Sequence, residues 1–189
     1  MKYSSDTRYG TVAQAFHWLT AIFVLAAFIY GPGSSEARVY AVARDFERQI
    51  HETLGLCVLA LVVLRLLWRW VDKHPEPALL PKWMDLAAKL VQGLLYVLLF
   101  AVPMTAVTGA WLQGHPLTLL AGLQIAPQLA LSHDTGTTIA TLHTWLGDAI
   151  LWVAGFHAIA AIYHHLFLKD DVLSSMLPVW VPLYRPKGD

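Results

Sequence analysis

The chain has 189 residues, of which 57% are hydrophobic and only 14% charged, and its formal net charge is zero. Soluble domains usually carry about 25% charged residues. With a mean hydropathy of +0.51, the composition therefore favours a membrane protein of a single domain, residues 1–189, over a soluble globule. The lack of net positive charge argues against a nucleic-acid partner.

Among the side chains that bind metals, cysteine is nearly absent from this sequence whereas histidine is abundant. Cys57 is the only cysteine, so the chain alone cannot build an iron–sulfur cluster or a cysteine zinc site. Nine histidines are many for a chain with so few polar residues. The histidines are therefore the first candidates for a cofactor site.

Four apolar stretches are long enough to cross a bilayer, whose core of about 30 Å needs about 20 helical residues. We predict an all-α, integral membrane four-helix bundle with spans at about 12–30, 50–71, 86–112 and 138–168. Gly, Pro and Ser residues separate the stretches, and Pro103 should kink the third. A cleaved signal peptide is the alternative for the first span, but the tripeptide 41–43 lies too far beyond the apolar run.

Lysine and arginine predict the orientation, because cytoplasmic loops are enriched in them. With a cytoplasmic N-terminus, the inner side holds ten of these residues and the outer side three. Both termini are therefore predicted to face the cytoplasm. The inner residues are Lys2, Arg8, Arg65, Arg69, Lys73, Lys82, Lys89, Lys169, Arg185 and Lys187, and the outer ones are Arg38, Arg44 and Arg48.

The fourth stretch is longer than one bilayer and should project beyond it. Four histidines then fall within the membrane, where ionisable residues are costly and are functional candidates by default. His143 and His157 are 14 residues apart, which places them on nearly one helix face and about 21 Å apart along the axis. His51 begins the second span on the outer side, and His17 begins the first on the inner side. Depth therefore pairs His51 with His143 and His17 with His157.

Two imidazoles from separate helices at each level favour haem over zinc. Zinc takes three or four protein ligands, whereas haem takes two axial ligands and fills the space between helices. Gly55 and Gly147 follow His51 and His143 by four residues and leave room for a porphyrin; close helix packing is the alternative. The remaining loop histidines, interpreted as surface residues, are His74, His115 and His133.

Arginines near the two histidine levels are candidate contacts of the cofactor. Arg65 lies 14 residues after His51, at the inner level, where it can pair with a haem propionate; snorkelling to the headgroups is the alternative. Arg44 and Arg48, at the outer mouth, can hold a propionate or attract an anionic donor. Steering of an anion needs a local positive field, and this outer segment sums to zero. The acidic residues that balance it are Glu36, Asp45 and Glu47.

The chain contains these short motifs: Phe16–Trp18, the His51 segment, Leu64–Arg69, Gly114–Pro116, Gly155–Ala158 and His164–Asp170. In their order and spacing they resemble the bacterial cytochrome b561 family over nearly the whole chain. The resemblance implies a bacterial inner-membrane bundle with two b haems, and it assigns the axial ligands to His17, His51, His143 and His157. It also implies ubiquinone as the electron acceptor. The most similar members are superoxide oxidases of the periplasmic face; others are cytochrome subunits of a dehydrogenase or hydrogenase.

For the quinone, we expect contacts near Trp18, His164 and Lys169 at the cytoplasmic end. His164 is seven residues after His157, shares its face, and can relay the protons that quinone reduction takes up. An aromatic and basic interface belt is the alternative for Trp18 and Lys169. Asp148, within the fourth span, has no assigned role.

Three functions remain in competition. The first is a stand-alone superoxide:ubiquinone oxidoreductase embedded in membrane lipid, and the second is an electron-transfer subunit with a redox partner protein. The third is a haem-free membrane protein such as a small transporter. The lack of a long partner-binding loop favours the first, whereas the neutral outer segment favours the second. Two axial imidazoles leave haem iron no open position, so outer-sphere electron transfer is the expected role.

Overall fold

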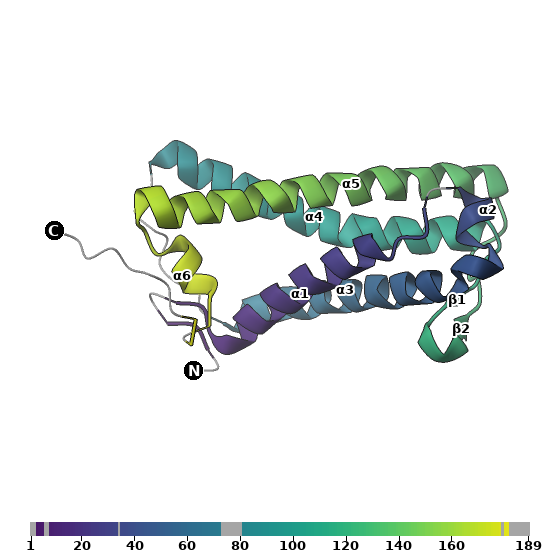
Figure 1. Ribbon diagram of the computed structural model, residues 1–189, viewed down its shortest axis with the longest axis horizontal. Helices are drawn as coiled ribbons and strands as arrows, with labels where there is room; N and C mark the ends of the chain where they lie inside the picture. The colour runs from purple at the N-terminus through teal and green to yellow at the C-terminus, as the bar shows by residue number, and fades with distance from the viewer. Residues whose placement is uncertain (1–2, 6–7, 34, 73–80, 179, 182–189) are drawn as a thin grey trace.

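The structure is a computed structural model that describes residues 3–5, 8–33, 35–72, 81–178 and 180–181. Within these residues, four long helices form an elongated bundle (Figure 1). They are α1 (Thr11–Ile29), α3 (Asp45–Val71), α4 (Lys82–Leu112) and α5 (His133–Tyr163). Each belongs to a segment long and apolar enough to cross a membrane, which confirms the predicted all-α membrane fold. The prediction for His74 lies outside the described residues, as do Lys2, Lys73, Arg185 and Lys187.

Short elements close the two ends of the bundle. We name the ends outer and inner after the predicted orientation. The outer end carries α2 (Glu36–Val39), η1 (Val42–Arg44), β1 (Leu117–Thr118), η2 (Leu120–Gly122) and β2 (Gln124–Ile125). The two strands form an antiparallel pair with Leu117 opposite Ile125. At the inner end, α5 passes into a π-helical turn, η3 (His164–Leu168), which is followed by α6 (Val172–Met176).

Three of the long helices begin four or five residues before the predicted spans, at Asp45, Lys82 and His133. Their first turns are polar and contain acidic side chains such as Asp85 and Asp134. A carboxylate is favourable there because it faces the positive end of the helix dipole. Hydropathy marks only the part of each helix that lies in hydrocarbon, so it misses these turns.

The four helices pack mainly as two pairs, with α1 along α3 and α4 along α5. Close approach of α4 and α5 near the outer end depends on two glycines. A Cβ on Gly109 would lie 3.0 Å from the Ala140 nitrogen, and one on Gly136 would lie 2.9 Å from the Gln113 nitrogen. Small residues allow such contacts between membrane helices. Between the α1–α3 pair and the α4–α5 pair lies a space lined by side chains of all four long helices.

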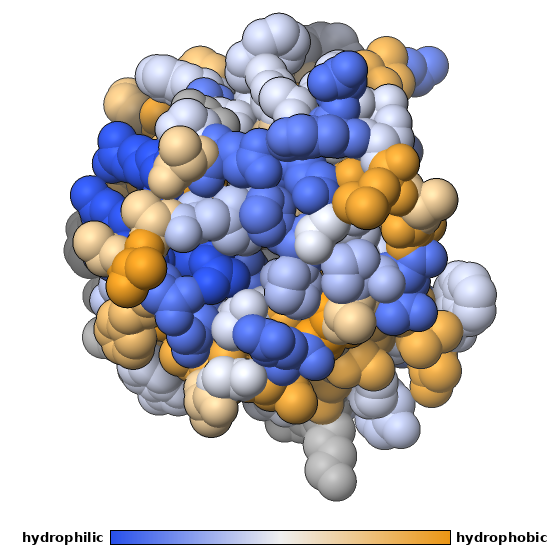
Figure 2. Space-filling model, turned by 90° about the vertical axis from the view of Figure 1, so that its right-hand side faces the viewer, coloured by the Kyte–Doolittle hydropathy of each residue, from blue (hydrophilic) through white to orange (hydrophobic). Residues whose placement is uncertain are grey.

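The sides of the bundle are apolar and the outer end is polar. Leucine, isoleucine and phenylalanine side chains of all four long helices are exposed, as expected of surfaces in contact with lipid tails. Exposed tryptophans near the inner end, Trp70, Trp83 and Trp180, match the aromatic belt of a membrane interface. Figure 2, which views the outer end, shows mainly hydrophilic residues with apolar ones toward the margin.

Candidate functional site

His51 of α3 and His143 of α5 meet between the two helix pairs, near the outer end. Their ring centroids are 5.9 Å apart and the rings are nearly perpendicular, at 83°. The pairing predicted from depth is therefore present in the structure. We call these two residues the outer pair.

Backbone carbonyls orient both rings of the outer pair. Nδ1 of His51 lies 2.7 Å from the carbonyl oxygen of Ala27, and Nδ1 of His143 lies 2.9 Å from that of Val102. A carbonyl oxygen only accepts, so Nδ1 carries the proton in each ring and Nε2 keeps its lone pair. Histidines that bind metals usually have such a partner on the second nitrogen.

One of these carbonyls lies at the end of α1 and the other within α4. Ala27 lies in the last turn of α1, where carbonyl groups lack helical donors, and the Gly31 N–H bonds to Phe28 instead. Val102 immediately precedes Pro103, and its carbonyl also accepts a hydrogen bond from the Thr105 hydroxyl at 2.8 Å. The last turn of α1 thus leaves one acceptor free for the outer pair, and the Val102 carbonyl of α4 accepts from both His143 and Thr105.

A cavity of about 810 Å³ opens beside the outer pair. Part of this space is open to solvent. Gly55 and Gly147 both line the cavity, and a Cβ at either would have no neighbouring atom within 4 Å. The two glycines therefore border open space rather than a close helix contact. Most other lining residues are apolar: Val24, Leu56, Val58, Leu99, Pro103, Ala106, Val107, Leu117, Ile150 and Leu151.

His17 of α1 and His157 of α5 form the second predicted pair, toward the inner end. Their ring centroids are 6.3 Å apart, with the rings inclined at 69°. His17 also packs edge-on against the indole of Trp18, with 5.2 Å between ring centroids. No counterpart of the carbonyl contacts of the outer pair occurs at these two rings among the described residues. We call them the inner pair.

The spacing within each pair suits one metal ion held between two imidazoles. A bond from an imidazole nitrogen to a metal is about 2 Å long, so two such bonds in line, with the half-widths of both rings, separate the ring centres by about 6 Å. The observed separations are 5.9 and 6.3 Å. Nowhere in the described ranges do three His, Cys, Asp or Glu side chains group as an all-protein metal site requires. The geometry therefore fits a group that brings its own equatorial ligands, as haem does.

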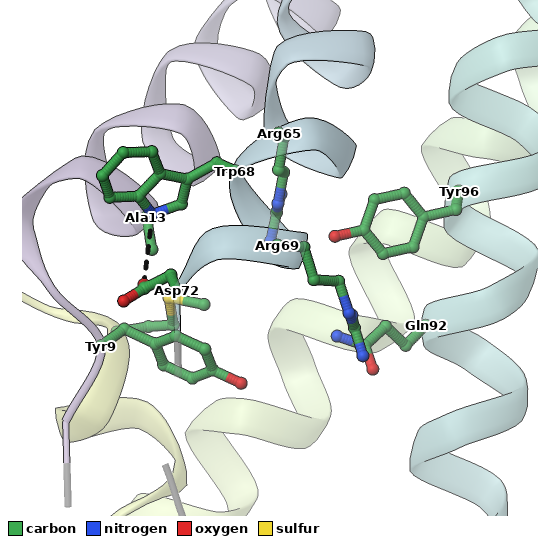
Figure 3. A pocket seen from close by; sticks show the side chains of 9 residues that line it. Tyr9, Ala13, Arg65, Trp68, Arg69, Asp72, Gln92 and Tyr96 are labelled. Atoms are coloured by element: carbon green, nitrogen blue, oxygen red, sulfur yellow. Dashed lines mark hydrogen bonds between the residues drawn. The ribbon is translucent and has the colours of Figure 1, made fainter. Parts of the chain in front are cut away.

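A polar pocket of about 410 Å³ lies at the inner end (Figure 3). Arg65 and Arg69 of α3 face Gln92 and Tyr96 of α4 across it, and Tyr9 closes it from the N-terminal segment. The Arg65 guanidinium lies 5.5 Å from the Tyr96 ring centroid, and its charge acts on both histidines of the inner pair.

Burial raises the pKa of the Tyr9 phenol, although Arg69 and Arg65 act in the opposite direction. Tyr9 therefore keeps its proton and remains a hydrogen-bond donor at neutral pH. This pocket could not be predicted from the sequence, because Tyr9, Gln92 and Tyr96 come from segments whose relative rotation is set by packing.

The residues expected around quinone lie at the inner end but do not surround this pocket. The Trp18 indole donates to the carbonyl of Met176 at 3.0 Å, which fastens α6 to α1. Nδ1 of His164 donates to the Asp170 carboxylate at 2.6 Å. Lys169 is exposed and has a left-handed backbone, with φ of 55°. Their role toward quinone remains a prediction.

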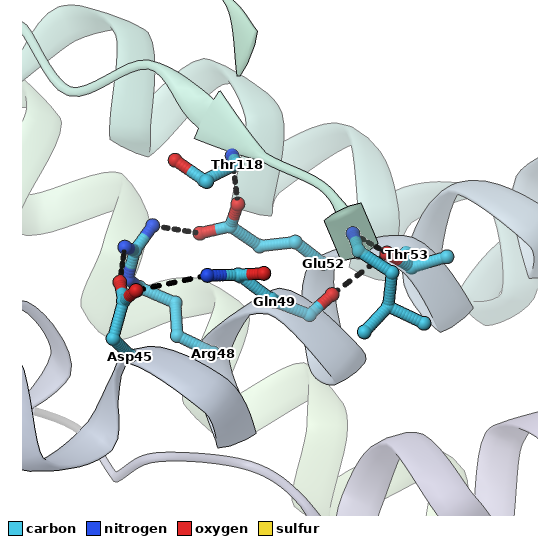
Figure 4. Close-up of polar contacts among 7 residues, drawn as sticks. Asp45, Arg48, Gln49, Glu52, Thr53 and Thr118 are labelled. Atoms are coloured by element: carbon cyan, nitrogen blue, oxygen red, sulfur yellow. Dashed lines mark hydrogen bonds and ion pairs between the residues drawn. The ribbon is translucent and has the colours of Figure 1, made fainter. Parts of the chain in front are cut away.

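An ion-pair network covers the outer mouth (Figure 4). The buried Arg48 guanidinium bonds to Asp45 and, at 3.3 Å, to Glu52. Glu52, which also lines the cavity, accepts a hydrogen bond from the backbone N–H of Thr118 in β1. The acidic neighbour of His51 thus ties the strand pair to α3, a contact that sequence reasoning missed.

Two histidines interpreted as surface residues have specific partners at the outer end. Nε2 of His115 donates to Glu36 at 2.7 Å, and Nε2 of His133 lies 3.3 Å from the other oxygen of the same carboxylate. The Tyr40 ring stacks on His115 with centroids 3.5 Å apart. His115 is therefore part-buried rather than free at the surface. Arg44 pairs with Glu47 at 3.4 Å and is not among the residues that line the cavity.

Comparison with known proteins gives a consistent family. The family model for prokaryotic cytochrome b561 matches residues 8–179. Cytochrome b561 homolog 2 of Escherichia coli (strain K12) is 30% identical over 177 residues, covering 92% of this chain and 93% of the relative. The probable superoxide oxidase CybB of Yersinia pestis is 27% identical, covering 90% and 96%, and cytochrome b562 of Cereibacter sphaeroides is 30% identical, covering 92% and 98%. With four potential membrane helices and paired histidines, this chain therefore belongs to the prokaryotic cytochrome b561 family and is a membrane cytochrome b.

Proposed function

We propose that this cytochrome holds two b haems, one in each histidine pair, and passes electrons from superoxide at its outer, periplasmic face to ubiquinone at its inner end. The observation that supports this most is that α5 contributes one histidine to each pair, about 21 Å apart along the helix, with a partner ring at 5.9 or 6.3 Å in each case. A bacterial inner-membrane location follows from the same proposal.

The chain's own residues prepare the two sites for haem. The carbonyls of Ala27 and Val102 hold the Nδ1 protons of the outer pair, so that both Nε2 atoms keep the lone pairs that a metal ion needs. Gly55 and Gly147 leave the apolar cavity open for a planar ring. Arg65, within electrostatic reach of the inner pair, supplies the positive charge that a propionate needs.

Haem supplies one-electron oxidation and reduction when bound. In the overall reaction two superoxide anions each lose one electron and leave as dioxygen. One ubiquinone takes up the two electrons and two protons and becomes ubiquinol. The apolar walls of the outer cavity keep water away from the path, and the two histidines of α5 set the distance that the electrons cross.

The inner pocket is the place we assign to the quinone head group. Its guanidinium groups, from Arg65 and Arg69, and its phenols, from Tyr9 and Tyr96, are hydrogen-bond donors for the two carbonyl oxygens. Trp18, His164 and Lys169 lie at the same end of the bundle, where His164 with its Asp170 partner can pass protons from the cytoplasm.

The haem stoichiometry tests the scaffold. We expect the purified protein to show a reduced-minus-oxidised b-type spectrum, and His143→Ala and His157→Ala each to lose one of two haems, as measured by the pyridine haemochrome. Each histidine pair is a separate site, so loss of one pair should spare the other. His133→Ala, on the same helix but outside both pairs, should keep the wild-type haem content. A haem content indifferent to both substitutions would sink the proposal.

A second candidate, the electron-transfer subunit of a larger complex, is favoured by the ion pairs of the outer end. Arg48 is engaged by Asp45 and Glu52, and Arg44 by Glu47, so these arginines offer little unpaired charge to steer an anion. The distinguishing measurement is ubiquinone reduction by the purified protein with superoxide as the only donor. The third reading, a haem-free transporter, is disfavoured because the chain belongs to a cytochrome family.

A further inference from the structure

One face of α5 is exposed along most of its length and points away from the histidine pairs. Its residues are spaced alternately by four and three positions, the heptad spacing of a helix–helix seam. At 100° per residue, Asp148 and Trp152 lie about 140° and 180° around the axis from His143. Figure 1 shows α5 along one edge of the bundle. The exposed residues of this face, which we call the α5 seam, are Thr141, Trp145, Asp148, Trp152, Gly155 and Ile159.

Exposure of the Asp148 side chain to lipid would be energetically unfavourable. It lies near the middle of the membrane segment His133–Leu168 and is exposed. In the part of the chain that the structure describes, its carboxyl group has no hydrogen-bond or ion-pair partner. Ionisable residues at the bilayer centre are costly and almost always face protein or water. The position of Asp148 therefore indicates that something other than lipid covers the seam.

Two indoles flank this carboxyl group at a depth where tryptophan is uncommon. Trp145 is one turn before Asp148 and Trp152 one turn after it, and both are exposed, by 68% and 69%. Tryptophan normally lies at the membrane interfaces rather than in the hydrocarbon. Neither indole N–H has a partner among the described residues, and the Trp152 ring is held in place by stacking on Phe156.

We propose that the α5 seam is the interface with a second copy of this chain, centred on Asp148. The seam is self-complementary in its hydrogen-bonding groups, because it presents a carboxyl acceptor between two indole donors. All copies insert in the same direction, so a two-fold axis along the membrane normal sets the two α5 helices parallel and each residue beside its equivalent. Each Asp148 then lies between the indole N–H groups of the other copy.

Two further features suit this arrangement. Gly155, one turn beyond Trp152, has no atom within 4 Å of a Cβ position and lets a second helix approach closely, as small residues do in membrane interfaces. A proton shared between the two carboxyl groups, together with the indole donors, offsets the repulsion between like charges. The seam lies opposite the histidine face, so the interface leaves the haem sites of both copies undisturbed.

Cysteine cross-linking in native membranes tests the proposal. In a Cys57→Ser background, Thr141→Cys and Ile159→Cys each place one thiol on the seam, and oxidation should give a species of twice the 21.0 kDa chain mass. Ala160→Cys is the matched control, since it is exposed beside Ile159 but is turned about 100° away, and it should stay monomeric. Equal cross-linking of positions 159 and 160, or none at either seam position, would overturn the proposal, as would a cross-link to a protein of another mass.

The role of Asp148 is tested in the same cross-linking background. Asp148→Leu should lower the yield at positions 141 and 159 at least ten-fold, whereas Asp148→Asn, which keeps a hydrogen-bonding side chain, should retain most of it. The visible haem spectrum should be unchanged in both, which separates a lost interface from a misfolded chain. An Asp148→Leu variant that cross-links as well as the parent would contradict the assignment.

Discussion

Gly147 stands one turn after His143 on α5 and borders the outer cavity, where a Cβ would have no neighbour within 4 Å. A leucine there would extend into the space that a porphyrin needs. We expect Gly147→Leu to lose the haem of the outer pair while keeping that of the inner pair. Pyridine haemochrome and the reduced spectrum of the purified variant measure both.

Gly93 provides the control for this substitution. It also has no atom within 4 Å of a Cβ position, but it is exposed on the lipid-facing side of α4. Gly93→Leu should therefore leave the haem content unchanged. Equal loss in the two variants would mean that helix flexibility, and not cavity space, is what the glycines provide.

Single residues differ in how far the sequence predicts their surroundings. The two histidine pairs could be predicted, because helix period and membrane depth together fix which imidazoles share a level. The partners of Trp18 and His164 could not, since the Met176 carbonyl and the Asp170 carboxylate reach them only through the turn after α5. The hydrogen bond of Glu52 could not be predicted either, because its carboxylate accepts from Thr118, which lies in a loop distant in the sequence.

At the scale of elements, two hydrogen bonds tie the outer loop that carries the strand pair β1–β2 to α3. The N–H of Thr118 donates to Glu52, and that of Leu120 donates to the Thr53 hydroxyl at 3.0 Å. Glu52→Ala removes the first acceptor, and an unsatisfied backbone group costs about 1–3 kcal/mol. We expect hydrogen exchange of the Thr118 amide to quicken about ten-fold or more, as followed by mass spectrometry of a peptide covering 114–125.

The neighbouring Glu47→Ala separates this effect from a general loss of negative charge. Glu47 pairs with Arg44 at 3.4 Å and has no contact with the strands among the hydrogen bonds of the described residues. Its removal should leave exchange in the 114–125 peptide unchanged. Should Glu52→Ala also leave it unchanged, the strands are held by packing alone.

The long helices were predictable as elements and the short ones were not. Four apolar stretches specify four spans because hydrocarbon tolerates little else. The helix starts at Asp45, Lys82 and His133 lie in water-facing turns, where hydropathy carries no information. The two-residue strands at Leu117 and Gln124 are too short for an alternating pattern, and the first of them is held by the acceptor that Glu52 of α3 offers to Thr118.

At the scale of the whole molecule, the helix pairs α1–α3 and α4–α5 face each other across the histidine rings. Bound haem would bridge α5 to α3 at one level and to α1 at the other. Ligands that bind only the folded state stabilise it by about 4 kcal/mol at a thousand-fold excess over Kd. We expect haem-depleted protein to melt about 10 °C or more below the loaded form in a fluorescence melting experiment, with His157→Ala between the two. Equal Tm values would show that direct helix packing, without the cofactor, holds the pairs together.

A single helix, α5, carries one histidine of each pair. The number of residues from 144 to 156 therefore sets both the distance and the rotation between the two imidazoles. One residue inserted or deleted there turns one imidazole by about 100° and shifts it by about 1.5 Å, so no change of loop can restore both sites at once. The same change in the loop between α4 and α5 moves neither histidine relative to the other. The chain is thus free to vary in length outside the membrane, while this helix keeps a fixed count of residues.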